Sequence, residues 1–99
     1  MLGREANYFV QSQLMSDPSS SETPLRTTFK IRLNGHTLAI ATVGQAYRFL
    51  TNYSLVGWLE SRALHDSAVA ALERAADNAI LAVQATNAVR ALLVSAKLL

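Results

Sequence analysis

The feature that most constrains the fold is an alternating run of residues interrupted by Asn34 and Gly35. Over 27–33, apolar and polar residues alternate strictly, which is typical of a strand with one buried face. Asn-Gly suits the two positive φ angles of a type I′ turn, and the alternation resumes over 36–41. The sequence therefore predicts an antiparallel β-hairpin.

A turn made of these two residues also fixes which residues face each other. The expected pairs, counted from the turn, are Leu33 with His36, Ile31 with Leu38, and Phe29 with Ile40. The apolar side chains of both strands then share one face, which supports the register independently of the turn. His36 falls on that face, where we expect it to be half-exposed beside the turn.

The other face of the first strand is basic. Arg26, Lys30 and Arg32 share the outward parity, and no aromatic residue shares that face for base stacking. Such a surface suits phosphates or an acidic protein. The simpler interpretation is that an exposed face needs polar residues and that charges protect a strand edge from aggregation. Weak nucleic-acid or anion binding through these residues is therefore the alternative function.

Helical periodicity begins directly after the hairpin. Thr42 and Gln45 form a T-x-x-Q capping box ahead of apolar residues at helical spacing. The predicted helices span about 43–52, 60–77 and 86–98. Residues 52–57 are expected to form a loop, and 79–83 is compatible with a third short strand or with further helix.

These elements predict an α+β fold. A lone hairpin is marginal in water, so the helices must cover its apolar face. We expect a single domain over residues 25–99, in which an antiparallel hairpin packs against two to three helices. Residues 1–24 are expected to be a disordered or flexible tail and linker, because 16–24 holds both prolines and four serines. Whether the tail folds on a partner stays open.

Composition narrows the classes of function. Of 99 residues, 51% are hydrophobic and 16% are charged, against roughly 25% charged in an average domain, which excludes disorder throughout. The net charge of +2 is lower than a strongly basic nucleic-acid binder would carry. Cysteine is absent, which excludes disulfides and thiolate zinc sites and suits a reducing cytoplasm.

No targeting or membrane segment is expected. The N-terminus lacks the basic start and apolar run of a secretory signal. The most apolar stretch, 79–99, is interrupted by polar residues including Arg90, which is costly at a bilayer centre. We therefore expect a cytoplasmic protein.

The residues that carry chemistry elsewhere form no catalytic pattern here. His65, Asp66 and Ser67 are the letters of a hydrolase triad, but neighbours on a helix point about 100° apart and cannot align. A metal needs three or four converging ligands, and the chain has two histidines and scattered acids. Gly44, at the start of a helix, suits weak anion binding, although a plain helix start is simpler. We expect no enzyme, no cofactor and no metal.

The last predicted helix indicates an interaction surface. After Asp77 the charged residues are Arg90 and Lys97, and the helix has more apolar perimeter than one small sheet can cover. The predicted interface residues are Val89, Leu92, Leu93, Val94 and Leu98. The alternative is a central helix buried within the monomer. The expected function is a non-catalytic protein-interaction or regulatory module that self-associates as a homodimer.

Four segments of the chain carry a further pattern. They are F-x-I-x-L-N-G at 29–35, T-V-x-x-A-x-x-x-L at 42–50, A-x-x-A-L at 68–72 and A-V-R-A-L-L at 88–93. Together they resemble a family of short bacterial domains of unknown function, common in proteobacteria. The resemblance covers about three quarters of the chain. It implies a hairpin followed by helices and brings no assigned active site. The chain departs from the family in lacking a proline after the first helix and in having Asn78 where glycine is usual.

Overall fold

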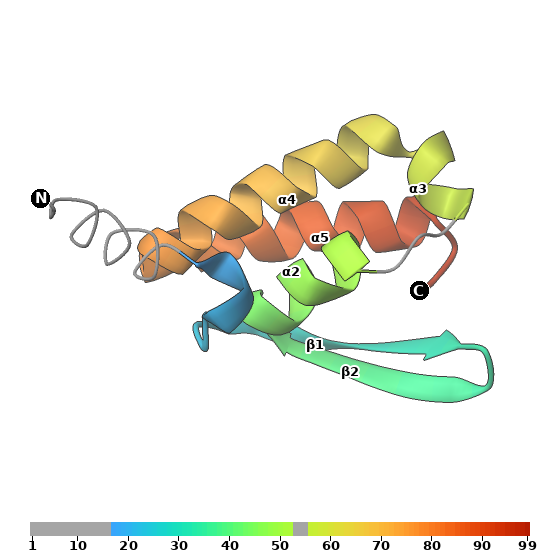
Figure 1. The fold of residues 1–99 in the computed structure, drawn as a ribbon, viewed down its shortest axis with the longest axis horizontal. Coiled ribbons are helices and arrows are strands. Elements are labelled where there is room, and N and C mark those ends of the chain that lie inside the picture. The colour runs from blue at the N-terminus through green and yellow to red at the C-terminus, as the bar shows by residue number, and fades with distance from the viewer. Residues whose placement is uncertain (1–16, 53–55) are drawn as a thin grey trace, which may run out of the picture.

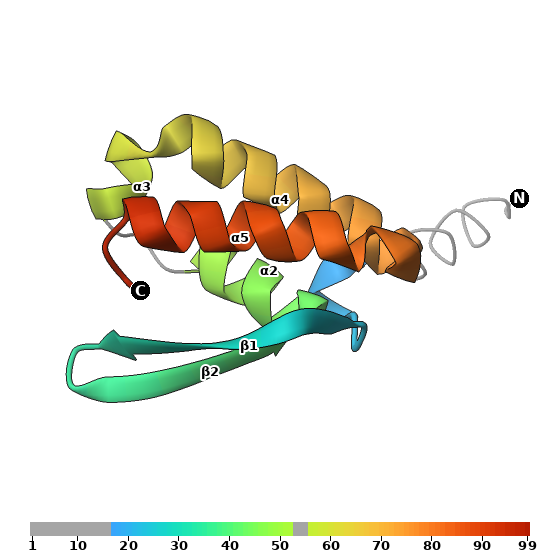
Figure 2. The same cartoon turned by 180° about the vertical axis from the view of Figure 1, so that it is seen from behind.

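The chain folds as a hairpin followed by helices (Figure 1). A computed structural model describes residues 17–52 and 56–99. The elements are η1 (Pro18–Ser20), β1 (Pro24–Leu33), β2 (His36–Thr42), α2 (Val43–Asn52), α3 (Val56–Glu60), α4 (Arg62–Asp77), η2 (Ala79–Leu81) and α5 (Ala82–Ser95). The hairpin forms one side of the molecule, α2 and α5 lie against it, and α4 lies beyond them (Figures 1 and 2). This arrangement confirms the predicted α+β class.

The hairpin has the predicted register. Its pairs include Leu33 with His36, Ile31 with Leu38, and Phe29 with Ile40. Asn34 and Gly35 have φ angles of 53° and 80°, as a type I′ turn requires. β1 begins at Pro24, before the strict alternation starts, and the pairing is irregular between Pro24 and Phe29. Local turn chemistry and period-two burial therefore determine this part of the fold.

The core lies between the inner face of the hairpin and the helices. Leu25, Phe29 and Ile31 of β1 and Ile40 of β2 are buried there. They meet the apolar stripes of the helices, whose large fully buried residues are Val43, Leu50, Leu72, Val89, Leu92 and Leu93. Burial of one such side chain contributes about 1.5–3 kcal/mol, so the helices supply the stability that a lone hairpin lacks.

Residues 17–23 belong to the folded body, which corrects the prediction of a flexible linker up to residue 24. Asp17 caps η1, because its Oδ1 accepts hydrogen bonds from the Ser19 amide at 3.0 Å and the Ser19 hydroxyl at 2.7 Å. The Val43 amide donates to the Thr23 carbonyl at 2.8 Å. The serine-rich segment is therefore ordered by tertiary contacts with α2, which its composition does not reveal. The rest of the predicted tail, 1–16, lies outside the described residues.

Gly44 allows this segment to lie against α2. Its amide donates to the Ser21 carbonyl at 3.0 Å, and a Cβ added here would lie 2.4 Å from that same oxygen. The amide of the next residue, Gln45, donates to the Thr42 hydroxyl at 3.1 Å. The first-turn amides of α2 thus have partners within the chain, so Gly44 serves close approach of the backbone and is not an anion site.

The ambiguous stretch 79–83 is helical, and no third strand forms there. The Asn78 side chain accepts a hydrogen bond from the Ile80 amide at 3.1 Å and starts η2, after which α5 begins at Ala82. The last helix therefore begins before the predicted residue 86 and also ends before 98. Lys97 has a φ of 63°, and the Leu98 amide bonds the Leu93 carbonyl at 2.9 Å, which is a Schellman closure.

The helix predicted at 60–77 corresponds to α4, which is preceded by the short helix α3. Part of α3 occupies the end of the predicted loop. Ser61 separates the two helices and is buried, with its hydroxyl 2.5 Å from that of Ser95 on α5. The described residues thus contain four α-helices where the sequence predicted two or three.

Candidate functional site

The predicted interface on α5 is mostly core. Val89, Leu92 and Leu93 are 1%, 0% and 0% exposed, so the prediction is wrong for these three residues. The physical reason is that α5 lies between β1 on one side and α4 on the other (Figure 2), and together these elements cover the side of α5 that carries these three residues. Leu98 is partly buried against the core, and Val94 is 57% exposed. The central-helix alternative therefore describes α5 better.

The basic face of β1 is present as predicted. Arg26, Lys30 and Arg32 are all exposed on the side of the sheet away from the helices. Across the hairpin, Lys30 pairs with Ala39 and Arg32 with Thr37. Within residues 17–52 and 56–99, none of the three cationic side chains forms a hydrogen bond or an ion pair. Their charges are therefore available to a partner.

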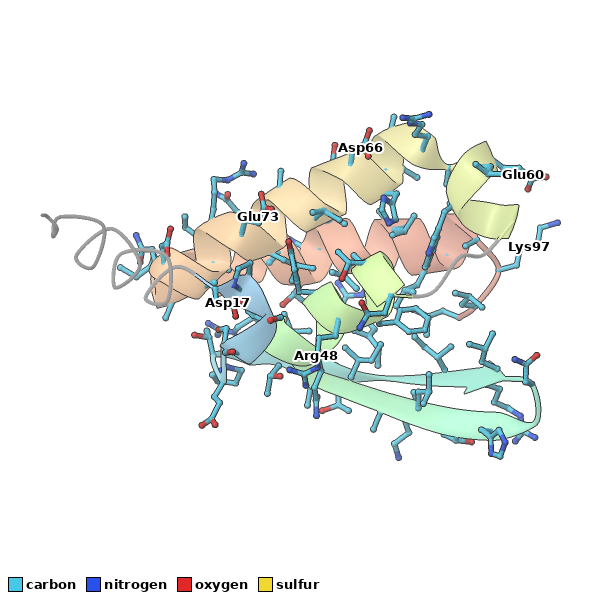
Figure 3. All side chains as sticks on the ribbon, viewed as in Figure 1. Asp17, Arg48, Glu60, Asp66, Glu73 and Lys97 are labelled. Atoms are coloured by element: carbon cyan, nitrogen blue, oxygen red, sulfur yellow. The ribbon has the colours of Figure 1, made fainter. Side chains whose placement is uncertain are left out.

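Charge is divided between the two sides of the molecule. Residues 24–52, the hairpin and α2, contain four cations and no acid; the cations are Arg26, Lys30, Arg32 and Arg48. Most acids lie on the other side, on α3 and α4; they are Glu60, Asp66, Glu73 and Asp77. Figure 3 shows Asp66 on the side away from the hairpin and Arg48 beside it, while the Glu73 carboxylate of α4 accepts from the Tyr47 hydroxyl of α2 at 3.4 Å. The hairpin side thus favours an anionic partner.

The outer edge of β2 has unused backbone groups. A two-residue turn makes Leu33 and His36 exchange both hydrogen bonds, and every second pair after them does the same. The amides and carbonyls of Thr37 and Ala39 therefore point away from β1. Beyond them, the Gln45 side chain accepts from the Ala41 amide at 2.7 Å and closes the edge. We call the stretch at Thr37 and Ala39 the β2 edge.

The two edges of the hairpin differ in how they are protected. β1 carries Pro24 and three outward cations, and its Arg26 amide donates to the Thr86 hydroxyl of α5 at 3.0 Å. Charged residues and proline are the devices that keep a sheet edge from pairing with another strand. β2, with the sequence HTLAIAT, has neither proline nor a Lys, Arg, Asp or Glu. β2 is therefore the edge that is chemically open to a further strand.

A hollow of about 240 Å³ lies beside the β2 edge, between β2 and α2. Its lining combines apolar side chains with polar ones; the residues are Leu38, Ala39, Ile40, Gln45, Arg48, Phe49 and Asn52. The Arg48 guanidinium donates to the Ser19 carbonyl, so the ordered serine segment holds this cation at the rim. The β2–α2 hollow was not predicted, although the acid-free run 24–52 and the neutral second strand were visible signals in the sequence.

His65 has a structural position next to a second hollow, of about 220 Å³, whose lining includes Trp58 and Asp66. Its Nε2 lies 2.8 Å from the Leu50 carbonyl; because a carbonyl only accepts, this nitrogen carries the proton. The ring also stacks at a tilt on Trp58, with 5.3 Å between centroids. His65 thus caps the end of α2. Ser67, the serine of the three triad letters, is exposed, whereas His65 is half-buried.

Among the residues that the structure describes, two side chains have shifted pKa values, and both lie outside the β2–α2 hollow. Hydrogen bonds from Ser19 hold the pKa of Asp17 below its usual value. Burial, followed by the charge of Glu73, raises the pKa of Tyr47, whose hydroxyl donates to the Glu73 carboxylate at 3.4 Å. Both shifts accompany local contacts that hold η1, α2 and α4 in place.

Residues 17–52 and 56–99 contain neither a metal-binding cluster nor a membrane-spanning helix. No group of three or more His, Asp or Glu side chains there is arranged to hold a metal ion. In the same part of the chain, no helix combines the length and the apolar character needed to span a bilayer.

Comparison with known proteins gave no match to a family model, to a curated protein or to a solved structure. The resemblance to short bacterial domains therefore stays a prediction.

Proposed function

We propose that this chain is a non-catalytic protein-interaction module of the cytoplasm that binds its partner on the hairpin side. The observation that carries the proposal is the β2 edge, where a neutral strand has unpaired backbone groups beside a hollow of mixed apolar and polar lining. Open strand edges are sites at which a further chain adds to a sheet. The unpaired cations of β1 add an electrostatic preference for an acidic partner.

Self-association stays a prediction. Three of its five expected contacts lie in the core, and the cations of residues 24–52 repel those of a second copy at the same face. Sedimentation velocity at increasing protein concentration tests it. A monomer throughout agrees with a different protein as the partner, whereas a concentration-dependent dimer makes a second copy the partner.

Capture from cell extract with charge-reversal variants tests the proposed function. The full chain, the double variant Lys30→Glu with Arg32→Glu, and the control Arg74→Glu are each immobilised. Arg74 is an exposed cation on α4, on the opposite side of the fold. The expected result is a partner protein retained by the unmodified chain and the control and lost from the double variant. Identical sets of captured proteins on all three would contradict the proposal.

Anion or nucleic-acid binding is the second candidate, and the outward face formed by Arg26, Lys30 and Arg32 favours it. For a single-stranded nucleic acid, each phosphate contact contributes about −0.7 to the slope of log affinity against log salt concentration. Labelled oligonucleotides at low salt test this candidate. If they bind, affinity should fall steeply with salt and weaken in Lys30→Gln with Arg32→Gln. If they do not bind at low salt, the candidate is excluded.

A further inference from the structure

We propose that the β2 edge binds an extended acidic segment of a partner protein by strand addition, with apolar and acidic side chains alternating along that segment. This inference rests on the proposed function and names the chemistry and binding mode of the partner. It combines three features of one place in the fold: unpaired main-chain groups, a hollow beside them, and a hairpin and α2, residues 24–52, that carry four cations and no acid.

The main-chain groups of Thr37 and Ala39 determine the register in which a partner strand would pair with β2. Both residues lie in pairs whose amides and carbonyls point away from β1. A strand about 4.8 Å away would exchange hydrogen bonds with both residues. The next outward amide, that of Ala41, already donates to the Gln45 side chain. The bound segment would therefore pair only with the stretch of β2 near the turn, at Thr37 and Ala39.

The hollow receives every second side chain of that segment. Side chains of a strand alternate between the two faces of the sheet, and those on the inner face would point toward α2. There half-buried Leu38 supplies apolar surface, and Ile40 and Phe49, which are buried in the core, complete the apolar part of the lining. Leu38 is half-buried, so an apolar partner side chain would cover surface that remains accessible in the free chain.

The other side chains of the segment meet the basic face. Lys30 and Arg32 lie opposite Ala39 and Thr37, which are small and exposed. The long cationic side chains can therefore lean across β2 toward the added strand. Arg48 adds a further cation at the rim of the hollow. An acidic segment gains from this field, whereas a second copy of the hairpin is repelled by it.

A nucleic acid fits these features less well. The outward face of the hairpin, over 24–42, presents threonine and alanine between its cations and no aromatic side chain for base stacking. Its bases would also leave the amides of the β2 edge without a strand to pair with. Open amides beside a hollow that can receive alternate side chains are the recognition mode of an extended peptide.

Fluorescence anisotropy with a short labelled peptide that alternates glutamate and leucine tests the inference on the full chain. The expected result is saturable binding that weakens with salt. The same peptide with lysine in place of glutamate should bind at least about tenfold more weakly, because like charges oppose it. A labelled oligonucleotide is measured in parallel.

Ala39→Pro is the decisive variant. Its ring removes an outward amide without removing a hydrogen bond to β1, a placement that edge strands tolerate. We expect about a tenfold loss of peptide affinity, since the paired main-chain group is gone. Arg74→Gln on α4 should leave affinity unchanged. Should Ala39→Pro fail to fold, a peptide methylated at alternate backbone nitrogens tests the same contact with the unmodified chain.

Several results would overturn the inference. They are equal peptide binding by Ala39→Pro or by the N-methylated peptide, equal binding of the lysine peptide, a dimer that Ala39→Pro dissociates, or an oligonucleotide that outcompetes the peptide. Absence of peptide binding at low salt also overturns it. If a captured partner nevertheless depends on Lys30 and Arg32, the proposed function stands without strand addition. If no partner depends on them, both proposals fail.

Discussion

α5 and β2 are both almost free of charge, yet they have opposite positions in the fold. α5 carries Arg90 as its one charged residue, and β2 carries no Lys, Arg, Asp or Glu. α5 has β1 on one side and α4 on the other, so most of its large apolar side chains are buried within the chain, although Val83 and Val94 are exposed (Figure 2). β2 has β1 on one side and an open edge on the other. An apolar element therefore indicates an interface only when its own neighbours leave a side free.

The largest expected effect tests the α5 half of this comparison. Leu92→Ala should lower the free energy of unfolding by about 2–5 kcal/mol, because Leu92 is fully buried and its truncation leaves a cavity. Val94→Ala, at an exposed position of the same helix, serves as the control and should change it by less than about 0.5 kcal/mol. Urea denaturation measures both. Equal effects would mean that α5 is not the central helix of the monomer.

Gly44→Ala tests whether residues 17–23 belong to the same folded body. The added Cβ meets the Ser21 and Ser19 carbonyls, which are backbone atoms, so the segment must shift away from α2. We expect a loss of about 1–3 kcal/mol in thermal or urea denaturation. A gain in stability, as helix propensity alone would give, would show that the segment does not pack there.

Thr86→Val tests how α5 protects the β1 edge. The buried Thr86 hydroxyl accepts from the Arg26 amide at 3.0 Å and donates to the Ala82 carbonyl at 2.7 Å. Valine keeps the shape and leaves the amide unpaired, at an expected cost of about 1–3 kcal/mol. Thr86→Ser retains the hydroxyl and should recover part of the loss in the same unfolding experiment. Equal stability of the valine and serine variants would argue against this hydrogen bond.

The smallest effect on stability is expected on the basic face. Lys30→Gln with Arg32→Gln should change the free energy of unfolding by less than about 0.5 kcal/mol per site, since both side chains are exposed and unpaired among the described residues. The contrast with Leu92→Ala separates residues that maintain the fold from residues free to bind. A large loss of stability here would assign these cations to the fold.

The hairpin could be predicted residue by residue because its determinants are local. Asn34 and Gly35 specify the turn, and period-two alternation specifies the faces. The contacts of residues 17–23 could not be predicted in this way, since they depend on Gly44, a glycine on another element. The end of α5 was also missed, because Lys97 takes the left-handed position that glycine usually occupies.

The candidate site was partly visible in the sequence. Arg26, Lys30 and Arg32 were assigned to the outward face correctly, because strand parity alone decides it. The interface on α5 was misassigned, because an apolar stripe does not say how many neighbours will cover it. The open edge of β2 required the register, the Gln45 hydrogen bond and the position of α2 together.

Amide hydrogen exchange of the free chain, read residue by residue by NMR, tests the central claim most directly. The account predicts rapid exchange at Thr37 and Ala39, slow exchange at Leu38 and Ile40 between them on β2, and slow exchange at Leu92 in the core. Protection of Thr37 and Ala39 in the free chain would contradict an open β2 edge. Rapid exchange at Leu92 would contradict a central α5.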